Sequence, residues 1–151
     1  MEIKDSGCRR EFPTGAVRDD NGSKGRCDLL PLEVVYRILA CDPIIKCIHF
    51  FMETGATSQL YIAMDLFSKM CFENDETMLL EVAKHFENGA KKYGDNNWQK
   101  GIPSSCYIDS ALRHYFKFRR GDKDEPHNLA FIWNLMCCIW EVDHHVYEGD
   151  K

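Results

Sequence analysis

The chain has 151 residues, a formal net charge of −5, 44% hydrophobic residues and 28% charged residues. This length and composition predict one compact domain with a buried core and exclude a chain disordered by composition. The acidic balance argues against a nucleic-acid polymer as partner, because such binding needs a basic surface. Basic residues do cluster locally, at Arg9-Arg10, Lys91-Lys92 and Arg119-Arg120, which suits a small anionic ligand.

Residues 1–27 are polar, contain several glycines and show no apolar periodicity, which predicts an irregular N-terminal arm. Its candidate anion-binding residues are Arg18, Lys24 and Arg26. Glycine lets backbone amides approach an anion closely, and a neighbouring Lys or Arg neutralises it. The arm is not a Walker A loop, since the G-K-[ST] ending is missing. A flexible tail and a lid over an active site both fit this pattern.

Apolar residues at helical spacing predict five or six helices after the arm. The helices are expected from about Pro31, Ile44, Leu60 and Leu79, over 105–119, and from Asp124-Glu125-Pro126. A β-strand at the third of these spans is the alternative. Asn88-Gly89 is expected to interrupt the fourth helix. The predicted fold class is therefore all-α, a compact helical bundle with an irregular N-terminal arm and a polar tail at 144–151.

The stretch Glu81–Gly101, EVAKHFENGAKKYGDNNWQKG, carries the strongest binding signal. Cations, aromatic rings and amides gather behind its helix pattern, at Lys91, Lys92, Tyr93, Asn97, Trp98 and Lys100. These residue types together suit a ligand with phosphates and a flat ring. A solvated helix end with one aromatic anchor is the alternative interpretation.

Ionisable groups recur on three predicted helices. They are Glu81, His85 and Glu87; Asp109, Arg113 and His114; and Asp124, Glu125 and His127. Facing helices in a bundle can pool carboxylates around Mg²⁺, which also accepts phosphate oxygens. The alternatives are a surface ion pair for Asp109 and Arg113, plain helix-start charge for Asp124-Glu125, and a structural His114. Trp133 is expected in the core.

Five blocks of the sequence match a family pattern. They are TGAVRDD at 14–20, GRCDLLP at 25–31, FENGAKKYGDNNWQKG at 86–101, YIDSALRH at 107–114 and HNLAFIWN at 127–134. In order and composition they resemble the phage-type dATP/dGTP diphosphohydrolase family, which is similar in function to the MazG-like all-α nucleoside triphosphate pyrophosphohydrolases. Residues 42–77 have no counterpart in the compact family pattern and are interpreted as an insertion in a single catalytic domain of residues 28–143.

The resemblance implies hydrolysis of a purine deoxynucleoside triphosphate to its monophosphate and pyrophosphate, with Mg²⁺ (or Mn²⁺ or Co²⁺) as cofactor. By residue chemistry, the candidate metal ligands or bases in these blocks are Glu87, Asp109 and Asp124, with Glu81 and His127 as further ligands. The candidate phosphate contacts are Lys91, Lys92, Arg113 and His114. Tyr93 and Trp98 are expected to stack on the base and Asn97 to read its edge or the sugar. Arg18, Lys24 and Arg26 would form a lid.

Alternatives from other functional classes remain open at this point. One is a nucleotide-binding sensor or interaction module without catalysis, and another is a structural helical protein. A homo-oligomer is expected, with the apolar residues of 44–52 serving as an interface or as ordinary core.

The sequence predicts neither export nor membrane insertion. No stretch approaches the ~20 continuous apolar residues of a membrane span, and MEIKDSGCRREF lacks the apolar run of a signal peptide. The eight cysteines contain no C-x-x-C pair, so the usual zinc spacing is absent. We therefore expect a cytoplasmic protein (in the host cytoplasm if it is viral) with no membrane partner and with reduced, buried cysteines. A disulfide framework is the alternative.

Overall fold

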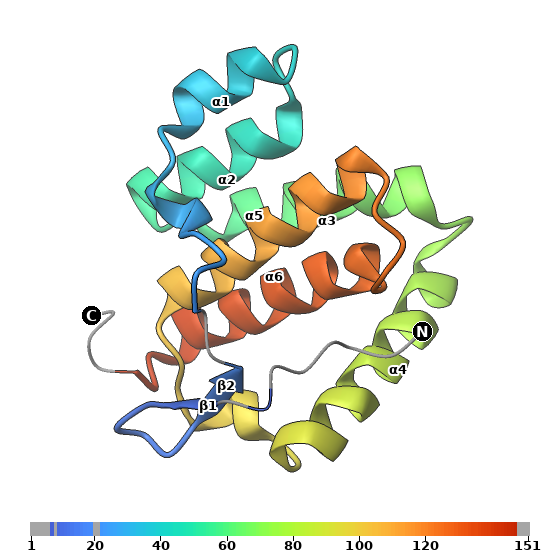
Figure 1. The fold of residues 1–151 in the computed structure, drawn as a ribbon. Helices are drawn as coiled ribbons and strands as arrows, with labels where there is room; N and C mark the ends of the chain where they lie inside the picture. Colours follow the sequence, from blue (N-terminus) through green and yellow to red (C-terminus); the bar gives the residue numbers. More distant parts are fainter. Residues whose placement is uncertain (1–6, 8, 20–21, 148–151) are drawn as a thin grey trace. The chain divides into compact units, whose positions relative to one another are not determined.

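A computed structural model describes residues 7, 9–19 and 22–147. Across these residues the chain forms six α-helices and one short β-hairpin, which confirms the predicted all-α class (Figure 1). Residues divide into two compact units, one of 1–28 with 81–151 and one of 29–80. None of the described helices has the length and apolar character needed to cross a membrane. No described cysteine forms a disulfide.

The unit of residues 29–80 is helical throughout. It contains α1 (Leu32–Ile38), α2 (Pro43–Thr54), α3 (Thr57–Cys71) and the first residues of α4 (Asp75–Tyr93). Asp42 caps α2, since its carboxylate accepts hydrogen bonds from the amides of Ile44 at 2.8 Å and Ile45 at 3.2 Å. The third span is helical, so the strand alternative for it is wrong. Within 44–52, Ile44, Ile45, Ile48 and Phe51 are core, whereas Phe50 and Met52 are exposed.

The other unit begins with a hairpin in the arm. Strands β1 (Arg9–Glu11) and β2 (Val17–Asp19) pair antiparallel with Arg10 opposite Arg18. The sequence showed no strand periodicity here because each strand is only three residues long. A single turn of 3-10 helix, η1 (Cys27–Leu29), follows the hairpin.

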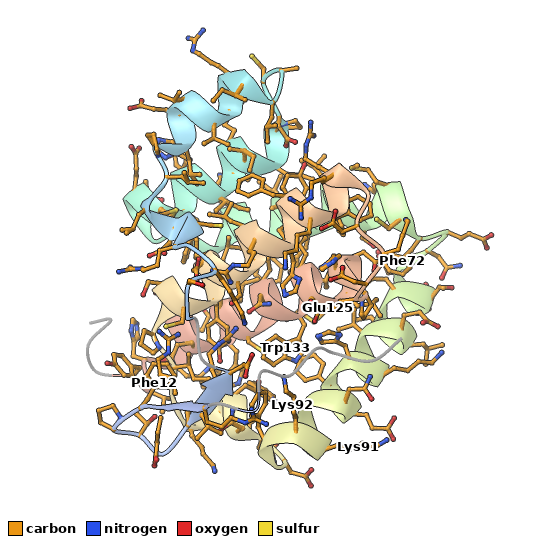
Figure 2. All side chains as sticks on the ribbon, viewed as in Figure 1. Phe12, Phe72, Lys91, Lys92, Glu125 and Trp133 are labelled. Carbon is orange, nitrogen blue, oxygen red and sulfur yellow. The ribbon has the colours of Figure 1, made fainter. Side chains whose placement is uncertain are left out.

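Helix α4 runs unbroken through Asn88-Gly89 to Tyr93, so the predicted interruption is wrong. One glycine in a helix costs about 1 kcal/mol relative to alanine, which the rest of a long helix outweighs. The helix ends where Gly94 adopts a left-handed conformation with φ of 90°. At this end Lys91 points outward and Lys92 points toward Trp133 (Figure 2).

The remaining elements are η2 (Asn97–Lys100), α5 (Ser104–Arg120) and α6 (His127–His144). Helices α5 and α6 lie side by side and antiparallel (Figure 1). Their buried face includes Tyr107, Leu112, Phe131 and Leu135. Glu141 of α6 is fully buried, and its carboxylate accepts hydrogen bonds from the amides of Ile102 at 3.0 Å and Tyr147 at 2.9 Å. These bonds fix the loop before α5 against the end of α6.

Candidate functional site

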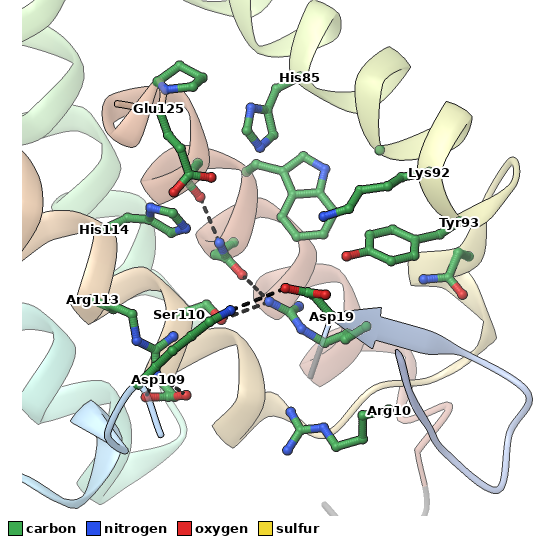
Figure 3. Close-up of a pocket in the computed structure, with 18 of the residues that line it drawn as sticks. Arg10, Asp19, His85, Lys92, Tyr93, Asp109, Ser110, Arg113, His114 and Glu125 are labelled. Carbon is green, nitrogen blue, oxygen red and sulfur yellow. Dashed lines mark hydrogen bonds and ion pairs between the residues drawn. The ribbon is translucent and has the colours of Figure 1, made fainter. Parts of the chain in front are cut away.

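A cavity of about 360 Å³ opens in the unit of residues 1–28 and 81–151 (Figure 3). The hairpin, α4, α5 and α6 all contribute to its wall. Segments at both ends of the sequence therefore meet at one concave surface, which is where ligands bind in most proteins.

The wall of this cavity is rich in positive charge. Its cations are Arg10, Arg18, Lys24, Lys92, Arg113 and Lys117, and its acids are Asp19, Asp109 and Glu125. Asp19 pairs with Lys24 at 3.3 Å, and Asp109 pairs with Arg113 at 2.6 Å. Since cations outnumber acids by six to three, the cavity suits an anionic ligand.

Arg18 links the hairpin to the helices that line the cavity. Its guanidinium donates hydrogen bonds to the hydroxyl of Ser110 at 2.8 Å and to the side-chain oxygen of Asn134 at 3.2 Å. The same group lies 5.1 Å from the ring centre of Tyr107 and 5.8 Å from that of Trp133. These contacts hold the guanidinium in one place, as recognition of an anion requires.

Several buried polar atoms in the cavity wall have no hydrogen-bond partner among the described residues. They are Nε of Arg10, Nη1 of Arg18, Nδ1 of His85 and Nε1 of Trp133. A buried polar atom without a partner costs about 1–3 kcal/mol, and each such atom in a native protein calls for an explanation. A polar ligand bound in the cavity would explain these atoms, because it would supply their hydrogen-bond partners.

Two histidines and two acids form a second polar group beside the cavity. Nδ1 of His114 lies 2.9 Å from Nδ1 of His127, and Nε2 of His127 lies 2.8 Å from Oδ1 of Asp124. The ligand atoms of His114, His127 and Glu125 all lie within 4.8 Å of one another. Burial first, and then the electrostatic effect of the neighbouring His127, hold the pKa of His114 well below its usual value, so its imidazole is neutral.

A family model described as "dATP/dGTP diphosphohydrolase, N-terminal" matches residues 56–151. The chain belongs to the dATP/dGTP diphosphohydrolase family. The matched span contains the blocks at 86–101, 107–114 and 127–134, and it begins inside the 42–77 segment interpreted as an insertion. No curated protein and no solved structure matches the chain.

In this diphosphohydrolase-family chain, eight of the residues given a substrate-binding or metal-binding role from the sequence line the cavity. They are Arg18, Lys24, Lys92, Tyr93, Asn97, Asp109, Arg113 and His114. Two of these residues, Asn97 and Asp109, also make hydrogen bonds that hold the N-terminal arm in place. The amide of Asn97 accepts from the Val17 amide at 2.8 Å and donates to the Val17 carbonyl at 2.7 Å, which fastens the hairpin.

Asp109 likewise fastens the arm. Its carboxylate accepts from the Cys27 amide at 2.7 Å, and its two oxygens both accept from Nη2 of Arg113, at 2.6 and 2.7 Å. Arg113 also donates to the Gly25 carbonyl at 2.6 Å. The i,i+4 ion pair expected from the sequence is thus present, but it is part-buried and binds residues 25–27 to α5 rather than lying on the surface.

The other candidates do not line the cavity. Glu87 and Lys91 are exposed on α4, and Glu81 pairs with Lys84 at 2.9 Å. Arg26 is exposed and pairs with Asp28 at 2.7 Å. Trp98 packs edge-on against Phe86 and Trp140, with ring centres 5.7 and 5.1 Å away.

The expected convergence of Glu87, Asp109 and Asp124 on one ion is not what the structure shows. Groups of three or more potential metal ligands among the described residues are His114 with Glu125 and His127, and Asp122 with Asp124 and His127. Asp124 and His127 belong to these groups, and Glu81, Glu87 and Asp109 do not.

Several wall residues of this family member received no site role from the sequence, chiefly Asp19, Lys117 and Trp133, and Arg10 was noted only as part of a basic pair. Trp133 was expected in the core, yet it is only half-buried and its indole Nε1 is among the unpartnered atoms. The charges of Arg9, Arg10 and Asp19 are visible in the sequence, but only the pairing of the two strands brings these residues next to α4 and α5.

Proposed function

We propose that the cavity binds a purine deoxynucleoside triphosphate and that the protein hydrolyses it to the monophosphate and pyrophosphate. The family match supports the reaction class. The single observation that carries the assignment to this cavity is the set of buried, unpartnered polar atoms in a wall where cations outnumber acids. A triphosphate provides the negative oxygens that such a wall needs.

The cavity divides into a cationic part and an aromatic part. Arg10, Arg18 and Lys92 are the proposed phosphate contacts, and neutralising charge that develops on departing pyrophosphate lowers the barrier to cleavage. Tyr93 and Trp133 are the proposed surfaces for the base, since both rings line the cavity. Asn97 is not proposed as a base reader, because both ends of its amide are bonded to Val17.

A divalent metal ion is part of this proposal. The described residues that fit one are His114, Glu125 and His127 at the cavity and Asp122 and Asp124 next to them, which offer imidazole nitrogens and carboxylate oxygens. When bound, such an ion neutralises phosphate oxygens and makes a bound water more acidic. Lys92 and Arg18 would orient the triphosphate beside it.

The test is a panel of the four deoxynucleoside triphosphates and GTP, incubated with purified protein and Mg²⁺ or Mn²⁺. Chromatography should show dAMP or dGMP together with pyrophosphate, and little product from pyrimidine nucleotides. Release of inorganic phosphate or of triphosphate would show that the reaction class is wrong. Saturable binding without any product would instead favour the sensor function.

We also propose that the protein forms a homo-oligomer. The large hydrophobic side chains that are exposed among the described residues all fall between Leu29 and Leu80, including Val34, Ile38 and Tyr61. Exposed apolar groups concentrated in one part of a chain are typical of protein interfaces. Light scattering should give a mass above that of one chain, and a monomer at micromolar concentration would contradict the proposal.

A further inference from the structure

We propose that His114, Glu125 and His127 form a binding site for a first-row transition-metal dication, one that takes Mn²⁺, Co²⁺ or Zn²⁺ in preference to Mg²⁺. This inference names the metal class for the proposed function and rests on it for the role of the ion. The site shares only His127 with the ligands expected from the sequence, which were Glu87, Asp109, Asp124, Glu81 and His127.

The separation of the two imidazole nitrogens fits shared coordination. Nδ1 of His114 and Nδ1 of His127 lie 2.9 Å apart. Two nitrogens that each lie about 2.1 Å from an ion, at roughly a right angle, are about 3.0 Å from one another. An oxygen of Glu125 lies within 4.8 Å of both nitrogens, so a third ligand is at hand.

Asp124 prepares His127 to act as a ligand. Its carboxylate lies 2.8 Å from Nε2 of His127, and a carboxylate accepts hydrogen bonds only, so Nε2 carries the proton. The lone pair of His127 is then on Nδ1, the atom that faces His114. A carboxylate that orients a histidine through its other nitrogen is the usual partner of a metal-binding histidine.

Burial makes a cation at this place favourable. His127 is 2% exposed and Glu125 is 9% exposed. Charges are weakly screened in a buried site, so a dication there interacts strongly with a nearby carboxylate. Glu125 offers such a carboxylate next to the substrate cavity, which His114 and Glu125 both line.

The donor types decide between metals. Two imidazole nitrogens with one carboxylate suit Mn²⁺, Co²⁺ and Zn²⁺, whereas Mg²⁺ strongly prefers oxygen ligands. The neighbouring group of Asp122, Asp124 and His127 is richer in oxygen. However, Asp124 is exposed and already bonded to His127, so we assign it the orienting role.

Figure 3 shows how the site relates to the cations. His114, Glu125 and His85 lie toward one end of the cavity, and Arg10 lies at the opposite end. A triphosphate lying between the two ends would meet the metal on one side and guanidinium groups on the other.

The test is a titration of the purified, chelator-treated protein with Co²⁺ in the absence of nucleotide, read by visible absorption. We expect a saturable band for one ion per chain that survives an about hundredfold excess of Mg²⁺. Glu125→Gln and His127→Asn should each weaken Co²⁺ binding by at least about tenfold, and Asp124→Asn by about tenfold. The matched control is His85→Asn, which lines the same cavity outside this group and should bind Co²⁺ like the wild type.

Circular dichroism and thermal melting would verify that each variant folds. If His127→Asn does not fold, the near-isosteric Glu125→Gln still tests the site. The absence of a saturable band, displacement by Mg²⁺, or equal weakening by His85→Asn would overturn the inference. None of these results depends on turnover. Failure of the whole nucleotide panel would instead remove the proposed function while leaving the Co²⁺ result intact.

Discussion

The guanidinium of Arg18 donates a hydrogen bond of 3.2 Å to the side-chain oxygen of Asn134, 116 positions later in the chain. Asn134 is held in turn, since its amide nitrogen donates to the Ala130 carbonyl at 2.8 Å. The arm predicted as a flexible tail or a lid is therefore fixed into the wall of the cavity at this residue. It contributes a preorganised cation, which recognises an anion without the entropy cost of ordering a mobile loop.

Replacing Arg18 tests this arrangement. Arg18→Ala should raise the Kd or KM for the preferred nucleotide by about 10- to 100-fold, because it removes a charge-assisted phosphate contact worth about 1.5–3 kcal/mol. Arg26→Ala is the matched control: it removes the same charge from the same arm, but Arg26 is exposed and outside the cavity wall. Equal losses in the two variants would show that only the net charge of the arm matters.

Two carboxylates, Glu125 in the cavity wall and Glu87 outside it, give a second contrast. Glu125→Gln should reduce kcat by at least about 100-fold, because Glu125 is buried beside the cavity and among the proposed metal ligands. Glu87→Gln should change kcat by less than about twofold, because an exposed charge is well screened by solvent. Steady-state kinetics with melting curves would check both, and a large loss in Glu87→Gln would return the site to the carboxylates expected from the sequence.

The glycine inside α4 offers a test in which stability and function move in opposite directions. A methyl group on Gly89 would meet no atom within 4 Å, so Gly89→Ala should stabilise the fold by about 0.5–1 kcal/mol. The same methyl group would narrow the cavity that Gly89 lines and should raise KM severalfold. Asn88→Ala is the control, since Asn88 is outside the wall. A Gly89→Ala variant with unchanged KM would place the substrate elsewhere.

Part of the site could be predicted from the sequence because α4 is a regular helix. His85, Gly89 and Lys92 follow the i, i+4, i+7 spacing of one helix face, and all of them line the cavity. Glu87 lies two positions from His85, which puts it on the opposite side of the helix. The same helical periodicity separates Lys92, which lines the cavity, from Lys91, which is exposed.

The contribution of the hairpin to the site could not be predicted from local sequence patterns. Arg10 contacts the thiol of Cys106 at 3.2 Å, 96 positions away. Its role follows from the antiparallel pairing of three-residue strands, which is too short to give an alternating signal. The histidine pair was equally hidden, because His114 and His127 come from different helices and only the antiparallel packing of α5 and α6 brings them together.

The last prediction concerns acid stability and the buried His85. Burial first, and then the charge of Lys92, lower the pKa of His85 from 6.5 to about 4. Between pH 6.5 and pH 4 the unfolded chain therefore binds a proton at His85 that the folded chain does not bind. The contribution of His85 to the free energy of unfolding is fully present above pH 6.5 and is lost as the pH falls toward 4. At about 1.4 kcal/mol per pH unit, the loss reaches roughly 3 kcal/mol.

His85→Leu removes this titration and should flatten the fall in the free energy of unfolding between pH 6.5 and 4. The slope should decrease rather than vanish, because the lowered pKa of His114 acts in the same direction. Urea unfolding at several pH values, with a chelator present, measures it. His145→Asn is the control: His145 is exposed and has a φ of 50°, which asparagine tolerates. If His85→Leu and the wild type lose stability in parallel, His85 is protonated as easily in the folded protein as in the unfolded chain.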